Sequence, residues 1–297
     1  MSSPPQPAHA HSLVLDKREN GVATVTLNRP DKLNALNKDL AVALNETLLS
    51  ISTDKHIAVV VITGEGRAFC AGGDLGVIGK GHQENDMADL EPLLRAGMGS
   101  VLKIRTLRQP VIAAVNGPAA GAGMNIALAA DIRIAADSAS FGENFVNVGL
   151  FPDYGGTYFL PELVGPAKAA ELFYTGEMID AKTALQLGIV NRIVPAAELA
   201  QAAQAFARKL ADGPHLAIQG VKHVLFGEKR DALVKALDQE VEQQMKCFQS
   251  KDCGEGIRAF LEKRKPRFEN SWESKADHAA QSKDSAPDSR PNPEPSR

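Results

Sequence analysis

The sequence predicts an α/β fold made of repeated strand–turn–helix units, followed by a helical C-terminal region. Two apolar runs, residues 58–63 and 110–115, are short and rich in β-branched side chains, and each ends at a glycine-containing turn. Such runs are typical of strands buried on both faces of a sheet. From about residue 166 onwards helical patterns dominate. The repetition favours stacked right-handed turns of chain over a doubly wound sheet.

The composition is that of an ordinary globular protein and argues against two classes of partner. Of the 297 residues, 44% are hydrophobic and 23% are charged. No apolar run approaches the ~20 residues that cross a bilayer. The formal net charge of -3 gives no electrostatic case for nucleic acid as a general partner. We therefore expect neither a membrane nor a nucleic acid as partner, with a local basic patch left open.

The cysteines and the first residues bear on the compartment. Cys70, Cys247 and Cys253 lack metal-ligand spacing and have no His companions, so we expect structural thiols in a reducing environment. The start of the chain lacks the basic and apolar regions of a secretory signal. The sequence therefore predicts a cytoplasmic protein whose residues 1–11 are disordered.

The first ordered unit is predicted to be a hairpin followed by a capped helix. Strands at 12–15 and 22–27 flank Asn20-Gly21, a dipeptide typical of tight hairpin turns. Asn37 is a candidate N-cap for the helix that follows. Side chains recur there at helical spacing, at Leu40, Ala43, Leu44, Thr47, Leu48 and Ile51.

The second unit begins with the strand at 58–63 and a loop that runs to Leu75. A polar connection with three glycines, residues 76–86, comes next. We interpret this connection as a solvated, mobile loop, and a lid over a bound substrate is the alternative. A helix is predicted over 89–107.

The third unit contains the stretch around which the chain is organised, residues 116–125. It lies between the strand at 110–115 and an Ala-rich helix at 124–130, and residues 121–123 have almost no side chain. The first N–H groups of a helix lack internal partners and carry partial positive charge. An oxygen that becomes negative during a reaction could be held there. Close strand–helix packing is the alternative role of these small residues.

The rest of the chain is predicted to be mainly helical. A strand at 132–135 precedes short helices at 166–174 and 181–187, and a last strand lies at 190–194. Four helices follow, at 196–211, 215–226, 230–248 and 252–264. Residues 269–297 are rich in Ser, Pro, Asp and Lys without apolar periodicity, which predicts a disordered tail to which we assign no function.

Five short motifs occur along the chain in a specific order. They are 29–36, Ala68-Phe69-Cys70-Ala71-Gly72-Gly73-Asp74-Leu75, Asn116-Gly117-Pro118-Ala119-Ala120-Gly121-Ala122-Gly123, Phe141-Gly142 and 149–157. Each motif is weakly specific, whereas the ordered set is specific and, ending near 263–268, covers nearly all of residues 12–268. In this set the chain resembles the crotonase (enoyl-CoA hydratase/isomerase) superfamily.

The resemblance implies a fold, an assembly and a class of substrate. The fold would be a crotonase-like ββα spiral core over 12–207, with a helical trimerisation region over 208–268. The assembly would be a homotrimer or a hexamer. The substrate would be an acyl-CoA thioester, with no separate cofactor because CoA is part of the substrate. The sequence contains no Gly-rich motif for ATP or a nicotinamide cofactor.

The resemblance also assigns roles to the two small-residue motifs. The N–H groups of Gly73 and Ala122 would form the oxyanion hole for a thioester enolate. The CoA and acyl portions would be held by segments that contain Lys32, Asn34, Ala35, Ala71, Asp74 and Leu75. The resemblance implies that Lys32 and the basic run 263–267 reach the CoA phosphates. The alternatives are that Lys32 is an ordinary surface lysine and that the basic run is a solvated charge run.

The acid–base residues depart from the hydratase pattern. The two glutamates that hydratases use for adding water fall at Asn125 and Phe145, so that neither position can accept a proton at neutral pH. Asn125 and Phe145 are expected to contact the substrate instead. Asp153 remains, as in isomerases that use a single carboxyl group, and capping of the next helix is its alternative role. Glu143 is a second candidate, more typical of a surface residue, and Tyr154 is expected to pack or to line the pocket.

These residues lead to three hypotheses. The first is an acyl-CoA isomerase that shifts a double bond or rearranges a ring epoxide through an enolate, with Asp153 as the base. The second is a hydratase or hydrolase of the same superfamily, in which Asn125 or Glu143 positions water. The third is a catalytically silent subunit that binds CoA thioesters.

Overall fold

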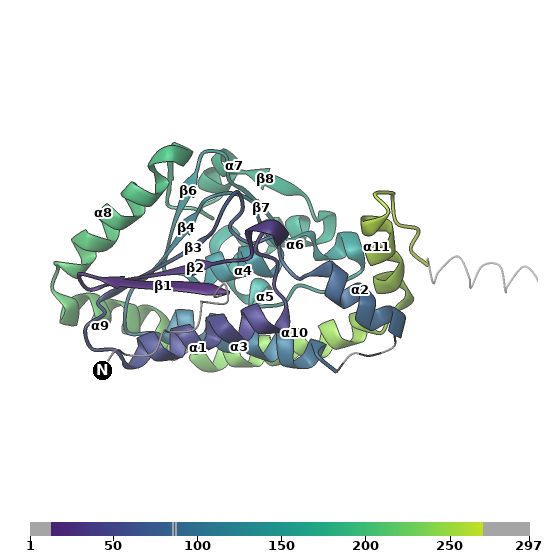
Figure 1. Cartoon of the computed structure of the whole chain (residues 1–297), viewed down its shortest axis with the longest axis horizontal. Helices are drawn as coiled ribbons and strands as arrows, with labels where there is room; N and C mark the ends of the chain where they lie inside the picture. The colour runs from purple at the N-terminus through teal and green to yellow at the C-terminus, as the bar shows by residue number, and fades with distance from the viewer. Residues whose placement is uncertain (1–12, 85, 87, 270–297) are drawn as a thin grey trace, which may run out of the picture.

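Two β-sheets and the helices around them form the described part of the chain, residues 13–84, 86 and 88–269 of a computed structural model (Figure 1). The strands are β1 (Val14–Glu19), β2 (Val22–Leu27), β3 (Val59–Gly64), β4 (Val111–Val115), β5 (Ala119–Ala120), β6 (Ile132–Ala136), β7 (Ser140–Gly142), β8 (Met178–Asp180) and β9 (Arg192–Val194). The α-helices are α1 (Lys38–Thr53), α2 (Leu75–Glu84), α3 (Leu90–Thr106), α4 (Ala122–Ala129), α5 (Gly156–Val164), α6 (Pro166–Thr175), α7 (Ala181–Gln186), α8 (Leu199–Ala211), α9 (His215–Phe226), α10 (Arg230–Phe248) and α11 (Lys251–Leu261). Short 3₁₀ helices are η1 (Pro30–Lys32), η2 (Asn144–Val148), η3 (Ala196–Glu198) and η4 (Gly227–Lys229).

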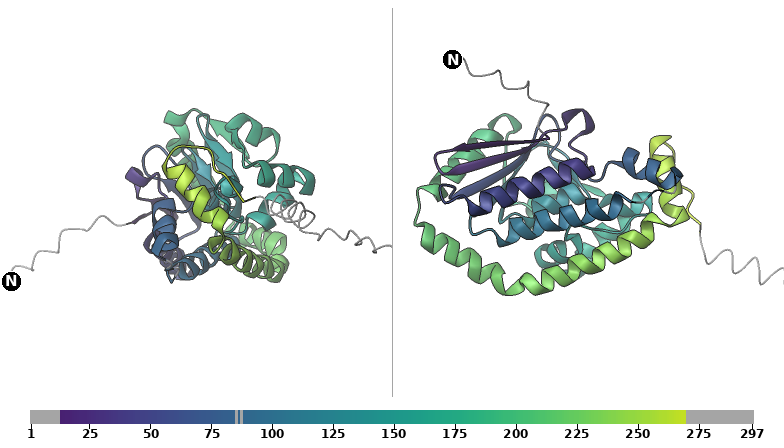
Figure 2. Two further views of the ribbon diagram at one scale, coloured as in Figure 1. Left: turned by 90° about the vertical axis from the view of Figure 1, so that its right-hand side faces the viewer. Right: turned by 60° about the horizontal axis from the view of Figure 1, so that its bottom comes forward.

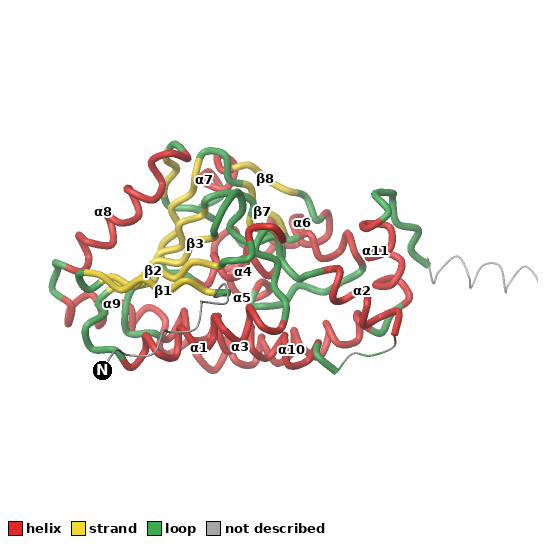
Figure 3. The backbone as a smooth tube through the Cα atoms, viewed as in Figure 1, coloured by secondary structure: helices red, strands yellow, loops and turns green. Residues whose placement is uncertain are grey.

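The larger sheet has the strand order β1-β2-β3-β4-β6-β9 and is parallel apart from β1, which pairs antiparallel with β2. The smaller sheet has the order β5-β7-β8. β3 and β4 are buried along almost their whole length, whereas the edge strand β1 buries only Val14. In Figure 3 the larger sheet lies between α8 on one side and α1 and α3 on the other. The two apolar runs that predict buried strands thus form the centre of the larger sheet.

Helices from distant parts of the chain pack together beside this sheet. α1 lies against α3, and α10 runs along α3, which the tilted view of Figure 2 shows clearly. α8 packs on β3, β4 and β6 at the other face (Figure 1). α10 also contacts α5. The packing therefore brings a helix from late in the sequence to the loop that precedes α5.

The hairpin and the helix cap are confirmed. Asn20 and Gly21 have φ angles of 52° and 78°, the left-handed conformation that a two-residue hairpin turn requires. The side chain of Asn37 accepts a hydrogen bond of 3.0 Å from Leu40 N. The local chemistry of these short segments is therefore sufficient to fix their structure.

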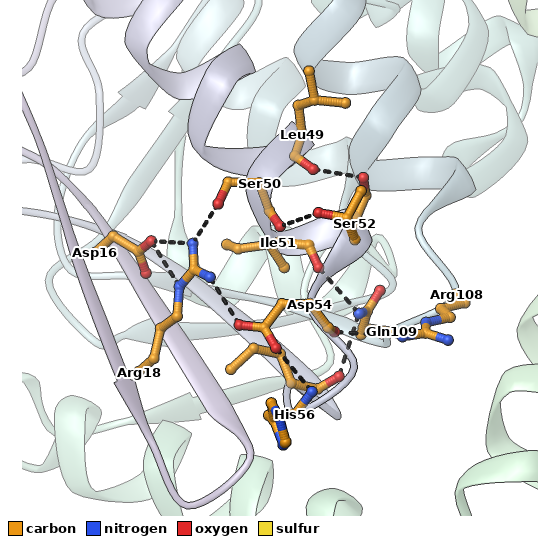
Figure 4. A network of polar contacts seen from close by, with 12 residues as sticks. Asp16, Arg18, Leu49, Ser50, Ile51, Ser52, Asp54, His56, Arg108 and Gln109 are labelled. Atoms are coloured by element: carbon orange, nitrogen blue, oxygen red, sulfur yellow. Dashed lines mark hydrogen bonds and ion pairs between the residues drawn. The ribbon is translucent and has the colours of Figure 1, made fainter.

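A polar network fastens β1 to the end of α1 (Figure 4). The guanidinium group of Arg18 contacts Asp16 at 2.7 Å, Asp54 at 2.9 Å and the hydroxyl oxygen of Ser50 at 2.9 Å. Asp54 also accepts a hydrogen bond of 2.8 Å from His56 N. The edge strand, which buries little apolar surface, is thus held by charged contacts.

Two predictions about secondary structure are wrong or incomplete. The connection at 76–86, expected to be a mobile loop, is mostly the helix α2, which packs on α11. Gly79 makes that contact close, because a Cβ there would lie 2.8 Å from Ile257 Cγ2. α5 was not predicted. The tertiary contacts of α2 override the low helix propensity of its glycines.

Three predictions concern the ends and the subdivision of the chain. The expected disorder of 1–11, and of 269–297 apart from Glu269, falls outside the described residues. The division between residues 207 and 208 lies within α8 and stays a prediction. Among the helices of the described residues, none is long and apolar enough to span a membrane.

Candidate active site

The loops that follow β3 and β4 lie backbone to backbone. The N–H groups of Phe69 and Cys70 donate to Pro118 O at 3.1 and 3.2 Å, and Ala120 N donates to Cys70 O at 3.0 Å. Gly72 allows this approach, because a Cβ there would lie 2.9 Å from Ala120 O. The ladder brings the residues after the two loops, including Gly73 and Ala122, to one wall of a cavity.

Glycines set the start of α4. Gly121 has φ +51° and ψ -128°, so it turns the chain into the helix with Ala122 as its first residue. A Cβ on Gly123 would lie 2.2 Å from Cys70 O. Within the described chain, Gly73 N and Ala122 N have no protein hydrogen-bond partner. Both residues line the cavity, so two backbone donors without a protein partner lie at its wall.

A third segment fixes the first loop from behind. Leu36 N donates to Gly72 O at 2.7 Å, and Asp74 N donates to Leu36 O at 2.9 Å. Asp74 is also paired with Arg29 at 2.9 Å. The amide of Asn34 donates to Ala68 O at 2.8 Å and accepts from Arg29 N at 2.8 Å. Gly73 is thus held between bonded neighbours on both sides.

The cavity has a volume of about 230 Å³ and a mostly apolar wall. Six of the predicted site residues line it: Ala71, Gly73, Leu75, Ala122, Phe145 and Asp153. Leu93 and Leu94 of α3, Tyr154, Phe248 and Phe260 contribute apolar surface. Of the described lining residues, Asp153 is the one carboxylate and Arg264 the one cation. Such a site suits a hydrophobic acyl group with one acid–base residue.

The other predicted site residues lie away from the cavity lining. Lys32 is exposed and Ala35 half-buried. Asn34 and Asp74 serve as supports of the first loop, as described above. Asn125 is fully buried, and its amide donates to Asp153 O at 2.7 Å and toward Glu143 Oε2 at 3.4 Å. Asn125 therefore holds the loop that carries Asp153 from behind.

Asp153 is buried with one oxygen free. Its exposed fraction is 6%, and Oδ2 accepts a hydrogen bond of 3.0 Å from Gln244 Nε2. Oδ1 has no partner in the described structure. Burial raises the pKa of Asp153 to about 8, and the nearby Glu240 carboxylate adds to this, while the bond from Gln244 opposes it. A pKa near neutrality suits a residue that both removes and returns a proton.

The capping role for Asp153 is wrong. α5 begins at Gly156, its N-cap is Gly155, and no side chain caps it. Tyr154 both lines the cavity and packs tightly, since a Cβ on Gly97 would lie 1.9 Å from Tyr154 Cζ. Asp153 therefore does not cap α5, and it lines the cavity instead.

Glu143 is not the surface residue that the sequence indicates. Its exposed fraction is 0%, and burial raises its pKa well above the usual range for Glu. Its Oε1 has no partner in the part of the chain described. Glu143 lies behind the cavity wall beside Asn125 rather than in the lining. It therefore has no direct access to a ligand in the cavity.

Two further polar residues, which the sequence motifs do not indicate, belong to α10. Glu240 and Gln244 are 2% and 1% exposed, and both bind the loop that carries Asp153. The available signal was their position, since they lie among Leu233, Leu237, Val241 and Phe248 on the buried face of α10. Polar side chains at core positions of an amphipathic helix mark a buried polar contact.

The C-terminal basic run is only partly engaged with the protein. Arg264 contacts Glu255 and Glu262, each at 2.6 Å, and lines the cavity. Lys263 and Lys265 are exposed.

In the described residues, no group of three or more His, Cys, Asp or Glu side chains could hold a metal ion.

Comparisons with known proteins agree with the motifs. The model of the enoyl-CoA hydratase/isomerase family matches residues 17–271. The chain is 38% identical over 262 residues to a 1,2-epoxyphenylacetyl-CoA isomerase of Escherichia coli (strain K12), covering 86% of this chain and 97% of the relative. It is 34% identical over 258 residues to a crotonyl-CoA hydratase of Syntrophomonas wolfei, covering 86% and 97%.

A solved structure shares the fold. An enoyl-CoA hydratase from Mycobacterium avium subsp. paratuberculosis K-10 matches with a TM-score of 0.79 at 31% identity, over 87% of this chain and 99% of that chain. The predicted α/β class, with a spiral core and a C-terminal helical region, is therefore confirmed.

Proposed function

This chain belongs to the enoyl-CoA hydratase/isomerase family, and we propose that it is an acyl-CoA isomerase. It would shift a double bond in an enoyl-CoA, or rearrange a ring-epoxide acyl-CoA, through a thioester enolate. The observation that carries the proposal is the pairing of two free backbone donors, Gly73 N and Ala122 N, with one carboxylate, Asp153, in one apolar cavity. The relative named an epoxyphenylacetyl-CoA isomerase supports the same reaction class.

The chemistry follows from these three groups. The Asp153 carboxylate removes a proton from the carbon next to the thioester, and the electron pair moves to the carbonyl oxygen. The Gly73 and Ala122 N–H groups donate to that oxygen, and loss of one such donor typically costs about 3 kcal/mol. In a double-bond shift the carboxyl group then returns the proton two carbons further along. One acid–base residue suffices because no water is added.

The CoA portion would bind along the first loop. We propose that Lys32 and the backbone near Ala35 contact the nucleotide end, because this segment lies beside that loop, with Lys32 exposed and Ala35 half-buried. Ala71 and Leu75 would contact the pantetheine and acyl portions, since they line the cavity. Asn34 and Asp74 would support the segment through their bonds to the backbone and Arg29.

Hydration is the second candidate, and the names of relatives favour it. The Syntrophomonas wolfei protein is a crotonyl-CoA hydratase. Against hydration stand Asn125, which is buried and bound to the Asp153 loop, and Phe145, which offers no proton acceptor. A hydratase mechanism would need Asp153 to perform both proton transfers at the site of water addition.

We also propose that the chain assembles as a homotrimer or hexamer. α9 exposes four large apolar side chains, Leu216, Val221, Val224 and Leu225. Exposed apolar patches mark sites of protein–protein interaction. Sedimentation equilibrium of the purified chain tests this proposal, and a monomer at micromolar concentration would contradict it.

The function is tested by following products rather than substrate loss. The purified protein is incubated with a 3-cis-enoyl-CoA, a 2-trans-enoyl-CoA and a ring-epoxide aryl-acyl-CoA in separate reactions, and products are identified by mass and by the absorbance of the conjugated thioester. We expect a shift or rearrangement with unchanged mass. Addition of one water to the 2-trans substrate as the main reaction would establish the hydratase instead. Saturable binding of all three without turnover would establish a silent subunit.

A further inference from the structure

Two side chains of α10, one helical turn apart, bind the loop that carries Asp153. Gln244 accepts a hydrogen bond of 3.0 Å from Phe151 N and donates to Phe151 O at 2.7 Å. Glu240 accepts from Gly155 N at 2.7 Å and from Thr157 N at 2.9 Å. The two residues therefore fasten the loop on both sides of Asp153.

The orientation of the Gln244 amide is determined by its partners. A backbone N–H can only donate, so the group that receives Phe151 N must be the amide oxygen. The amide nitrogen then faces Phe151 O and Asp153 Oδ2, at 2.7 and 3.0 Å. Gln244 thus offers Asp153 a hydrogen-bond donor and cannot offer it an acceptor without losing Phe151.

We infer that Gln244 is a positioning residue for Asp153, which occupies Oδ2 and thereby leaves Oδ1 as the oxygen that transfers the proton, and that Glu240 acts on the same carboxyl group through its charge. The inference rests on the proposed isomerase function. Oδ1 lacks a partner among the described residues, and Asp153 and Gln244 both line the cavity. Rotation of the Asp153 carboxyl group would break the bond between Oδ2 and Gln244.

The groups near Asp153 differ in the charge that they carry. Glu240 of α10 and Glu143, which follows β7, carry negative charge when ionised, and the neighbouring Tyr154 is a neutral phenol. The adjacent wall from α3 is apolar, and Arg264 reaches the same cavity from beyond α11. The Gln244 donor stabilises the Asp153 carboxylate and lowers its pKa, whereas the Glu240 charge raises that pKa. The two α10 residues thus act in opposite directions.

Because Gln244 and Glu240 shift the pKa of Asp153 in opposite directions, their variants distinguish a positioning role from a purely structural one. The pH dependence of kcat/KM for isomerisation is measured for two variants. Gln244→Met keeps the volume but loses the amide donor and acceptor. Glu240→Gln loses the charge and one of the two oxygens that accept backbone N–H groups. Activity requires the Asp153 carboxylate, so its rising limb follows the pKa of that group. We expect Gln244→Met to move the limb to higher pH and Glu240→Gln to move it to lower pH.

Gln244→Met is also expected to lower kcat by about a hundredfold, because a reacting group displaced by about 1 Å has such an effect. KM should change far less, since the CoA contacts are untouched. Gln244→Glu is a second variant of native shape in case the first does not fold, and its limb should also move up in pH. Gln239→Leu and Glu242→Gln, exposed positions on the same helix, are matched controls with wild-type profiles.

The outcomes separate this inference from the function on which it rests. Asp153→Asn that keeps full isomerase activity would overturn the function. If Asp153→Asn loses activity but the rising limb of kcat/KM stays in place in both α10 variants, the inference about Gln244 and Glu240 is overturned and the proposed function stands. Limbs that move in the same direction would also overturn it, because they would reflect general distortion of the loop.

Discussion

Asp54 and Asp153 are the same residue type in opposite surroundings. Asp54 lies in the network of Figure 4, where the bond from His56 N and the contact with Arg18 lower its pKa. Asp153 is buried near the Glu240 carboxylate, no cation among the described residues is bonded to it, and its pKa is raised. The first therefore stays ionised and holds β1 to α1, while the second can exchange a proton near neutral pH. Environment, more than residue type, separates a structural carboxylate from a reactive one.

The largest effect expected from this contrast is the loss of isomerisation in Asp153→Asn. General acid–base catalysis contributes about 10²- to 10⁴-fold, and we expect a loss of kcat in that range. Asn has the same shape and keeps an oxygen for the bond from Gln244, so the fold should persist. Steady-state assays with a 3-cis-enoyl-CoA, together with circular dichroism of the variant, measure both expectations. Activity within a few-fold of wild type would remove Asp153 from the mechanism.

The next effect is on the pH dependence of the wild-type enzyme. Burial raises the pKa of Asp153 to about 8 in the enzyme without substrate. The value of kcat/KM should therefore rise as the pH increases through 8. An unperturbed aspartate would give a limb near pH 4. Assays between pH 5 and 10 in buffers of constant ionic strength decide between the two positions of the limb.

A smaller effect is expected on stability as a function of pH. The folded-state pKa of Asp153 lies above its unfolded value, so the folded state binds the extra proton between about pH 4 and pH 8. Its contribution to stability is fully present below pH 4 and is lost as pH rises towards 8. Denaturant unfolding should therefore show a flatter pH dependence for Asp153→Asn than for wild type across this interval. Equal slopes would mean that Asp153 is not protonated in the folded state.

The smallest effect is expected for Asp54→Asn, which tests the other half of the comparison. The lowered pKa of Asp54 gives a contribution to stability that is present above its unfolded pKa and lost as pH falls through the folded value. The variant should be slightly less stable than wild type at pH 7 and equal to it in strong acid. Its isomerase activity should be unchanged, because the network in Figure 4 lies outside the cavity.

The sequence predicts best where local chemistry decides the structure. The Asn20-Gly21 turn, the Asn37 cap and the buried strands depend on residues close in sequence, and all are confirmed. The two small-residue loops were recognised because close backbone approach requires Gly at positions such as 123. For the same reason the oxyanion wall of the site could be proposed in advance.

Long-range contacts explain most of what was missed. The helix α2 forms although it contains Gly76, Gly79 and Gly81, because it packs on α11 more than 150 residues away. Glu143 looks like a surface residue until β7 and Asn125 enclose it. Gln244 lies 91 residues from Asp153 in sequence, and no local pattern links the two.

The pKa of Asp153 itself can be observed by infrared difference spectroscopy, with Asp153→Asn subtracted from wild type. The subtraction removes the signals of Glu143 and Glu240 as long as these groups keep their environments. We predict the C=O band of a protonated carboxylic acid at pH 6 to 7, which is replaced by carboxylate bands as pH passes about 8. A difference spectrum that shows only carboxylate at pH 6 would contradict the account, because Asp153 would then be an ordinary ionised aspartate.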